Sequence, residues 1–273
     1  MMRAGLLAAV LLFACGPSNR GNGDDDTGGG IDSGNGSGSG SGSGGGEQVF
    51  VYAHSPSTLY KIDPDTLQVQ MVGAFNWGSV GSDQMTDIAI DKNGQMIGVS
   101  FTRVYRVDPS NAATTLLSSQ LVRSFNGLSF VPAAQLGMTG DDVLVGTQST
   151  DGAVYRIDPM TGAATQVGNM GAYTSSGDLV GVAGFGTVQT VNGSGSDVLA
   201  RLATSTFAAS PIGTATGFSE IWGVAFFKDK IYGFTNGGAF LLIDPNTGAG
   251  TMVSNNGIQW WGAAVTTTAP VIF

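Results

Sequence analysis

The chain has 273 residues, of which 44 are glycine, 42% are hydrophobic and only 11% are charged, a balance that favours a folded β-rich domain over a disordered chain. Its formal net charge of −9, with 11 scattered Lys and Arg residues, argues against a nucleic-acid partner, because phosphate contacts need clustered basic side chains. The single cysteine, Cys15, lies in the N-terminal leader, so the rest of the chain has no disulfide, cysteine metal site or cysteine nucleophile.

Residues 1–14 have the pattern of a secretory signal peptide. A basic start, Met1-Met2-Arg3, precedes an apolar run over residues 4–13 that is too short to span a bilayer. The run ends in Leu12-Phe13-Ala14-Cys15, which resembles the lipobox of bacterial lipoproteins. This resemblance implies cleavage before Cys15 and a lipid on its thiol that holds the protein at a membrane. Gly16 follows instead of an aspartate, which under the sorting rule of such lipoproteins favours the outer membrane of a bacterial cell envelope.

Residues 15–46 are expected to form a lipidated, disordered tether. They consist almost entirely of Gly, Ser, Asn and Asp, which cannot bury enough apolar surface to order the chain. Asp24, Asp25 and Asp26 are adjacent and lack the alternating spacing and distal glutamate of a calcium loop. We therefore interpret them as a solvated acidic linker.

Residues 47–273 contain an internal repeat with two columns. The first is the aspartate of a Tyr-Arg-Ile-Asp-Pro-like segment, found at Asp63, Asp108, Asp158 and Asp244 and replaced by Ala203 in a degenerate copy. The second column opens a short apolar segment and is aligned at Asp87, Gly127, Gly181, Gly223 and Gly262. Five copies about 45 residues apart are typical of the four-stranded blades of a β-propeller.

The strands of one repeat can be predicted directly. In the last full copy they fall at residues 223–227, 231–235, 239–243 and 251–254. In the intervening turn, Pro245 fixes its φ and Gly248 takes the left-handed position. The domain starts with a second strand and ends with a first strand. We therefore predict a single, all-β, five-bladed propeller whose first blade is completed by both chain ends.

The repeat also resembles known bacterial propellers. The turn over residues 155–162, Tyr-Arg-Ile-Asp-Pro-Met-Thr-Gly, is similar to the quinoprotein-like and "IDPxTG" repeats, several of which have no assigned function. The similarity covers residues 48–268 and implies the fold, but it carries over no catalytic residue. No quinone-site pattern occurs, and no cofactor or metal is expected.

The loops that enter the innermost strands carry the candidate ligand-binding residues. Their polar positions, three residues before the second column, are Gln84, Ser124, Asp178, Glu220 and Gln259, and Trp222, Trp260 and Trp261 follow them. Tryptophan offers a flat apolar face and an N–H donor, which suits a saccharide, and a protein ligand is the other expectation. The alternative is that the large residues pack between blades and the polar ones satisfy strand ends.

The sequence therefore predicts a monomeric, non-catalytic binding or scaffolding module at the cell envelope. One alternative is a carbohydrate-active hydrolase, which needs two carboxyl groups about 5–10 Å apart. Glu220 would then act with Asp178, Asp83 or Asp87. A purely structural surface lipoprotein is the third hypothesis. The recurring Lys61, Arg106, Arg156 and Arg201 are expected to be structural, and His54, in a predicted turn, is expected at the surface.

Overall fold

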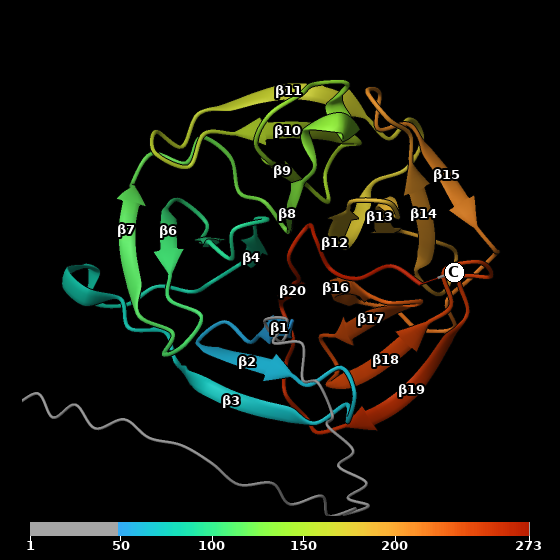
Figure 1. Ribbon diagram of the computed structural model, residues 1–273, viewed down its shortest axis with the longest axis horizontal. Coiled ribbons are helices and arrows are strands. Elements are labelled where there is room, and N and C mark those ends of the chain that lie inside the picture. The colour runs from blue at the N-terminus through green and yellow to red at the C-terminus, as the bar shows by residue number, and fades with distance from the viewer. Residues whose placement is uncertain (1–48, 273) are drawn as a thin grey trace, which may run out of the picture. The chain divides into compact units, whose positions relative to one another are not determined.

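The computed structural model describes residues 49–272, and no α-helix occurs among them. The strands form five sheets of four antiparallel strands each, arranged as blades around a central axis (Figure 1). The all-β, five-bladed propeller predicted from the repeat is thus confirmed. Cys15 and the expected signal peptide and tether lie outside the described residues.

The blades follow one another along the chain, and each consists of an innermost strand followed by three strands that lie progressively further from the axis. Blade 1 consists of β20 (Gly262–Ala264), β1 (Val51–His54), β2 (Thr58–Ile62) and β3 (Val69–Ala74). Blade 2 consists of β4 (Asp87–Ile90), β5 (Met96–Val99), β6 (Val104–Val107) and β7 (Thr114–Ser118). Blade 3 consists of β8 (Gly127–Val131), β9 (Val143–Thr147), β10 (Ala153–Ile157) and β11 (Ala164–Asn169). Blade 4 consists of β12 (Ser175–Val182), β13 (Gly186–Val191), β14 (Val198–Leu202) and β15 (Ala209–Ile212). Blade 5 consists of β16 (Ile221–Phe227), β17 (Lys230–Thr235), β18 (Ala239–Ile243) and β19 (Gly250–Asn255).

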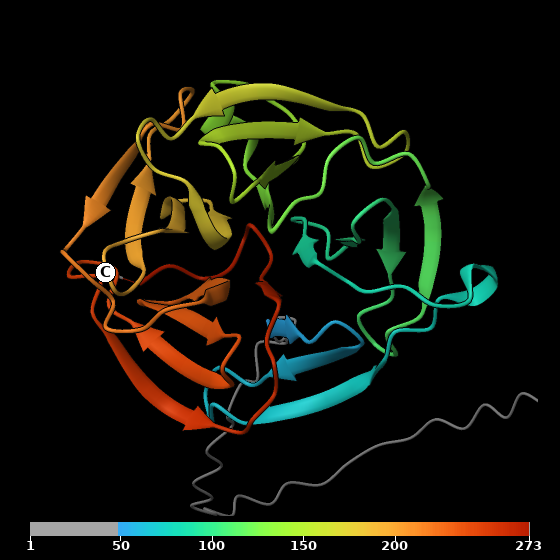
Figure 2. The ribbon, with the colours of Figure 1, turned by 180° about the vertical axis from the view of Figure 1, so that it is seen from behind.

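The two ends of the propeller meet in blade 1, as the sequence predicted. β20 pairs antiparallel with β1, with His54 opposite Gly262 and Tyr52 opposite Ala264. Seen from behind, the ring of blades is continuous between the blue and red ends of the chain (Figure 2). Because the last strand is hydrogen-bonded to the first, opening the ring requires breaking this pairing.

In four of the five blades a repeated aspartate closes the turn between the third and fourth strands, and Ala203 takes its place in blade 4. Asp63, for example, accepts hydrogen bonds from the backbone N–H groups of Asp65 and Thr66 at 2.9 and 3.2 Å. The expected left-handed turn position is confirmed at Gly162 and Gly248, whose φ angles are 74° and 72°. Leu67, Ala112 and Phe207 adopt the same conformation in the other three blades. The turn geometry is therefore maintained even where glycine is absent.

Strand pairing corrects the second repeat column in blade 4. In blade 2, Asp87 lies opposite Val99, near the end of the second strand. In blade 4 the pairs Leu179–Gln189 and Val180–Val188 place Asp178, not Gly181, at the equivalent position. The alignment was wrong by three residues because it matched Gly181 to the glycines of the other copies, whereas Gly181 lies further along β12, opposite Thr187.

A C-terminal strap, formed by residues 265–272, crosses one end of the central axis (Figure 1). Thr266 forms a parallel bridge with Ile90 of blade 2, and Thr267 accepts a 2.8 Å hydrogen bond from the backbone of Ala183 in blade 4. Pro270 accepts another, at 2.7 Å, from the backbone N–H of Lys228 in blade 5. The strap therefore ties blade 1 to three other blades across this end of the axis.

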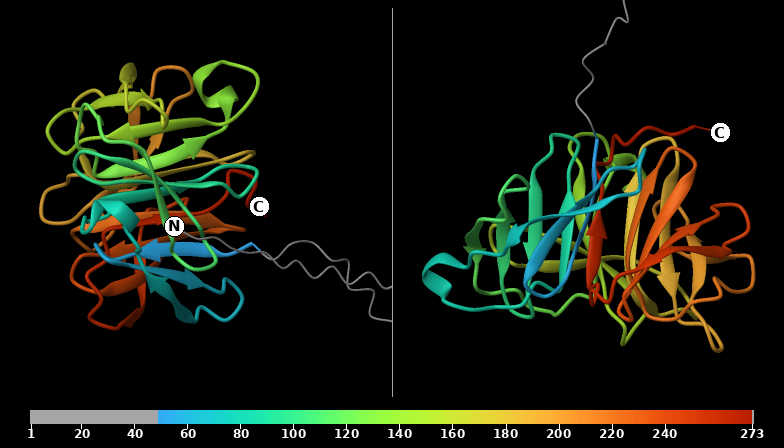
Figure 3. Two further views of the ribbon diagram at one scale, coloured as in Figure 1. Left: turned by 90° about the vertical axis from the view of Figure 1, so that its left-hand side faces the viewer. Right: turned by 90° about the horizontal axis from the view of Figure 1, so that it is seen from below.

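The two faces of the propeller thus differ. The strap face carries the strap, the Asp-Pro turns and the beginning of β1, and Figure 3 shows the start of β1 and the C-terminal end on the same side. The opposite, entrance face carries the loops that lead into the innermost strands, residues 75–86, 119–126, 170–174, 213–220 and 256–261.

Candidate functional site

The structure separates the predicted binding residues into three groups. Gln84, Ser124, Glu220 and Gln259 are exposed on the entrance face, and Trp222 and Trp261 are half-buried there. Asp178 and Trp260 are fully buried. After the corrected alignment, the polar position of blade 4 is held by Ser175, which is also buried.

Trp260 is a packing residue between blades. Its ring lies 5.1 Å from that of Tyr60 and 5.3 Å from that of Phe234, so it joins blade 1 to blade 5. For this residue, the inter-blade packing alternative raised from the sequence agrees with the structure.

An aromatic cluster, defined as Phe101, Trp222 and Trp261, lies at the mouth of the channel. Trp261 makes edge contacts with Trp222 at 6.1 Å and with Phe101 at 6.3 Å between ring centroids. Trp222 belongs to blade 5, Trp261 to the loop that enters blade 1, and Phe101 to blade 2, so chain folding brings the three rings together. Phe101 is 48% exposed and was missed by the sequence reasoning, although a phenylalanine within the polar turn Ser100-Phe101-Thr102 was a usable signal.

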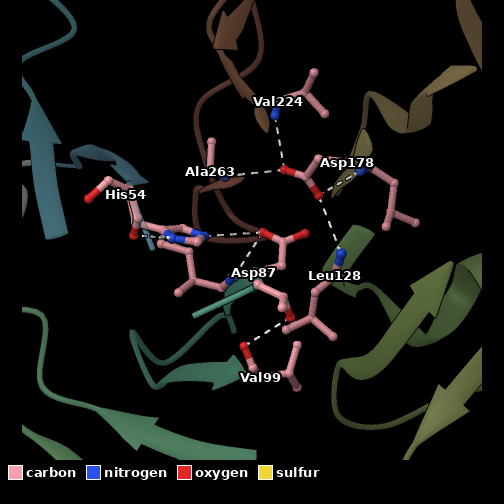
Figure 4. A network of polar contacts seen from close by, with 11 residues as sticks. His54, Asp87, Val99, Leu128, Asp178, Val224 and Ala263 are labelled. Carbon is pink, nitrogen blue, oxygen red and sulfur yellow. Dashed lines mark hydrogen bonds and ion pairs between the residues drawn. The ribbon is translucent and has the colours of Figure 1, made fainter. Parts of the chain in front are cut away.

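Asp178 lies at the centre of the propeller, among the innermost strands (Figure 4). One carboxylate oxygen, Oδ1, accepts hydrogen bonds from the backbone N–H groups of Leu179 and Leu128 at 2.6 and 3.4 Å. The other, Oδ2, accepts from Val224 and Ala263 at 2.9 and 3.3 Å. A single side chain of blade 4 therefore links the innermost strands of blades 3, 5 and 1.

His54 and Asp87 complete the buried centre (Figure 4). The Nδ1–H of His54 donates to the carbonyl of Ser55 at 2.9 Å, which leaves Nε2 facing Asp87 Oδ1 at 3.8 Å, too far for a hydrogen bond. Asp87 Oδ1 accepts the backbone N–H of Ile88 at 2.8 Å, whereas its Oδ2 has no partner. His54 is fully buried, so its predicted surface position was wrong: it ends a strand at the axis instead of lying in the turn.

Burial controls the protonation of this centre. It lowers the pKa of His54 to about 4, so the imidazole is neutral at pH 7. Burial also raises the pKa of Asp87 well above its ordinary value, and repulsion from Asp178 raises it further. Burial also raises the pKa of Asp178 well above its ordinary value, although backbone N–H donors and a hydrogen bond with Asp87 oppose part of that shift. We infer that the carboxyl pair shares one proton, which resides on Asp87.

The centre leaves no room for a ligand. A Cβ atom at Gly262 would clash with Asp87 Oδ1 and His54 Nε2, which shows how closely the backbone of β20 covers both groups. Among residues 49–272, no group of three or more His, Cys, Asp or Glu side chains is placed to hold a metal ion. At the axis, the four backbone N–H groups that donate to the Asp178 carboxylate hold the innermost strands of four blades together.

A cavity of about 430 Å³ lies beside the aromatic cluster, between blades 4 and 5. Trp222, Glu220 and Asp197 line it together with serine hydroxyl groups. Asp197 accepts the backbone N–H of Ile221 at 2.7 Å. Burial raises the pKa of Asp197, and repulsion from Glu220 acts in the same direction. Sequence reasoning found Glu220 and Trp222 but missed Asp197, which lies in a Gly/Ser-rich loop far from both in the chain.

The partners considered for Glu220 in a hydrolase are engaged elsewhere. Asp178 and Asp87 are fully buried on the axis. Asp83 accepts hydrogen bonds from Tyr105 Oη at 2.6 Å and from Arg103 Nη1 at 3.0 Å. None of the three presents a free carboxyl group to a substrate at the mouth.

Comparisons with known proteins identify the fold and no family. No family model matches the chain, and no curated protein matches it. Among solved structures, a symmetrical protein studied for its de novo evolutionary emergence aligns at 15% identity and TM-score 0.53, over 82% of this chain and 100% of that one. A chain of a nidogen/laminin complex aligns at 8% identity and TM-score 0.52, over 80% and 97%. TolB from Acinetobacter baumannii aligns at 17% identity and TM-score 0.44, over 76% and 52%.

The described part of the chain contains no helix of the length and hydropathy needed to cross a membrane.

Proposed function

We propose that this protein is a lipid-anchored, non-catalytic binding module of a bacterial cell envelope and that its entrance face is the binding surface. The observation that carries the proposal is the difference between the two faces of the propeller. The strap crosses one end of the axis and the buried centre fills the axis, whereas the entrance face keeps Phe101, Trp222 and Trp261 partly exposed. Grouped aromatic side chains at a surface are typical of ligand-binding and protein-binding sites.

The direction of the chain supports the same assignment. β1 is the first strand after the tether in the sequence, and it begins at the strap face. The expected tether would therefore join the propeller at the strap face, and the entrance face lies at the opposite end of the blades. A ligand or partner in the surrounding space could then reach the aromatic cluster.

Binding through the aromatic cluster can be tested with the full mature protein on a glycan array and by photo-crosslinking in intact envelopes. Trp222→Ala and Trp261→Ala are expected to weaken binding by about thirtyfold, since a central aromatic anchor contributes about 2 kcal/mol. Trp77→Ala is the matched control, because Trp77 is also half-buried but packs against Phe75 and Tyr105 outside the cluster. Equal binding by all three variants would contradict the role of the cluster, and an absence of any binding or crosslinking by the wild-type protein would favour a purely structural lipoprotein.

The anchor has a separate test. In a bacterial host grown with labelled palmitate, Cys15→Ser is expected to abolish labelling and release the protein from the membrane fraction, because serine offers no thiol for acylation. Ser18→Ala, a substitution close by in the predicted tether, should leave both unchanged. Labelling that persists in Cys15→Ser would show that the lipobox resemblance is misleading.

A further inference from the structure

The cavity between blades 4 and 5 has the size of a small-ligand site. Its volume of about 430 Å³ falls in the range of roughly 300–1,000 Å³ that such sites occupy. It opens beside Trp222, so it adjoins the aromatic cluster. A ligand could therefore fill the cavity and extend over the cluster.

The lining combines the groups that recognise a sugar ring. Trp222 supplies a flat apolar face, against which the C–H face of a pyranose can pack. Ser196 and Ser219 supply hydroxyl groups that can donate and accept hydrogen bonds with ligand hydroxyls, whereas the Ser176 hydroxyl is hydrogen-bonded to Asp197. This mixture favours a hydroxyl-rich ligand over a purely apolar one.

The charge of the lining restricts the ligand further. Asp197 and Glu220 both line the cavity, and no Lys, Arg or His does. Asp197 is only 5% exposed, and one of its carboxylate oxygens accepts a hydrogen bond from the backbone N–H of Ile221. Glu220, in contrast, is exposed and accessible to a ligand. An anionic sugar would be repelled from this lining, while an ammonium group would pair with Glu220 and be attracted to the indole face.

The backbone presents Glu220 in an uncommon conformation. Its φ is 55°, in the left-handed region, and its carbonyl accepts a 2.9 Å hydrogen bond from the backbone N–H of Asn236. A non-glycine residue held in this region is consistent with a functional position, and it supports what the cavity and its charges already indicate.

We propose that this cavity binds a saccharide unit with a free ammonium group, that is, an amino sugar that is not N-acetylated. The inference rests on the proposed function and deepens it by naming the ligand class of the same face. The ammonium group pairs with Glu220, the ring packs on Trp222, and ring hydroxyls bond to the serines.

The test is calorimetric titration of the mature full-length protein with three hexasaccharide probes: a glucosamine oligomer, its N-acetylated counterpart and a galacturonic acid oligomer. The glucosamine oligomer is expected to bind at least tenfold more tightly than the acetylated one, and the galacturonate is expected not to bind. Glu220→Gln should remove this preference. The matched control is Asp229→Asn, which removes one exposed negative charge at the turn between β16 and β17 on the strap face.

The outcomes separate the two proposals. Equal affinity for the glucosamine and acetylated oligomers, or a preference that survives Glu220→Gln, overturns the ammonium inference. If that binding still depends on Trp222, the proposed function stands. If none of the three probes binds, the inference is overturned, and the crosslinking test of the tryptophan variants then decides the proposed function by itself. Release of shortened oligomers during the titration would also overturn the inference and favour the hydrolase alternative.

Discussion

Replacing Asp178 with asparagine is expected to lower the free energy of unfolding by roughly 3–5 kcal/mol. The carboxylate accepts four backbone N–H groups, two on each oxygen, from four different blades. An asparagine can offer only one acceptor oxygen, so its NH₂ group would face two N–H donors that are buried and lose their partner. The cost is large because hydrogen bonds to a charged acceptor are strong and the site excludes water.

Urea unfolding of the wild-type and variant proteins, followed by tryptophan fluorescence, measures this effect. Asp229→Asn is the matched control, since it makes the same chemical change at an exposed turn and is expected to shift the free energy by less than about 0.5 kcal/mol. A loss below about 1 kcal/mol for Asp178→Asn would contradict the role of Asp178 as the link between the inner strands.

Asp87→Asn is expected to change how stability depends on pH. In the folded protein the pKa of Asp87 is raised by burial and by repulsion from Asp178, so the folded state holds a proton that the unfolded chain releases above about pH 4. The contribution of Asp87 to the free energy of unfolding of the wild-type protein is thus fully present below pH 4. It is lost as pH rises toward the folded pKa of Asp87, by up to about 1.4 kcal/mol per pH unit. The variant has no such proton, so its stability relative to wild type should increase with pH.

Urea unfolding at a series of pH values from about 4.5 to 9 gives this difference directly. The groups that face Asp87 are His54 from β1 and Asp178 from β12, with backbone N–H groups from the other inner strands. His54 has a folded pKa lowered to about 4, so both proteins lose stability as pH falls from about 6.5 toward 4, and this contribution cancels in the comparison. Parallel curves for wild type and Asp87→Asn above pH 5 would show that Asp87 is ionised in the folded protein.

The sequence by itself determined the blades, their number and the way the ring closes. Each of these depends on local signals that repeat along the chain. The aspartates at positions 63, 108, 158 and 244 cap turns by bonding to their own neighbours two and three residues ahead. In the last blade, the predicted strands agree with β16 to β19 within two residues at each end because short turns bound the strands on both sides.

The tertiary structure decided what lies at the centre and what lies at the mouth. His54 and Asp178 read as ordinary polar residues near turns, yet both are buried, because their positions along the inner strands point them at the axis, where five blades converge. The three-residue error in blade 4 had the same origin, since only the strand pairing shows that Asp178, and not Gly181, takes the position of the glycines in the other blades. Phe101, Trp222 and Trp261 likewise come from three blades, and Asp197 reaches Glu220 only through folding. A repeat specifies each blade through contacts within that blade, whereas the axis, the strap and the cavity arise between blades, where no local signal in the chain records which residues will meet.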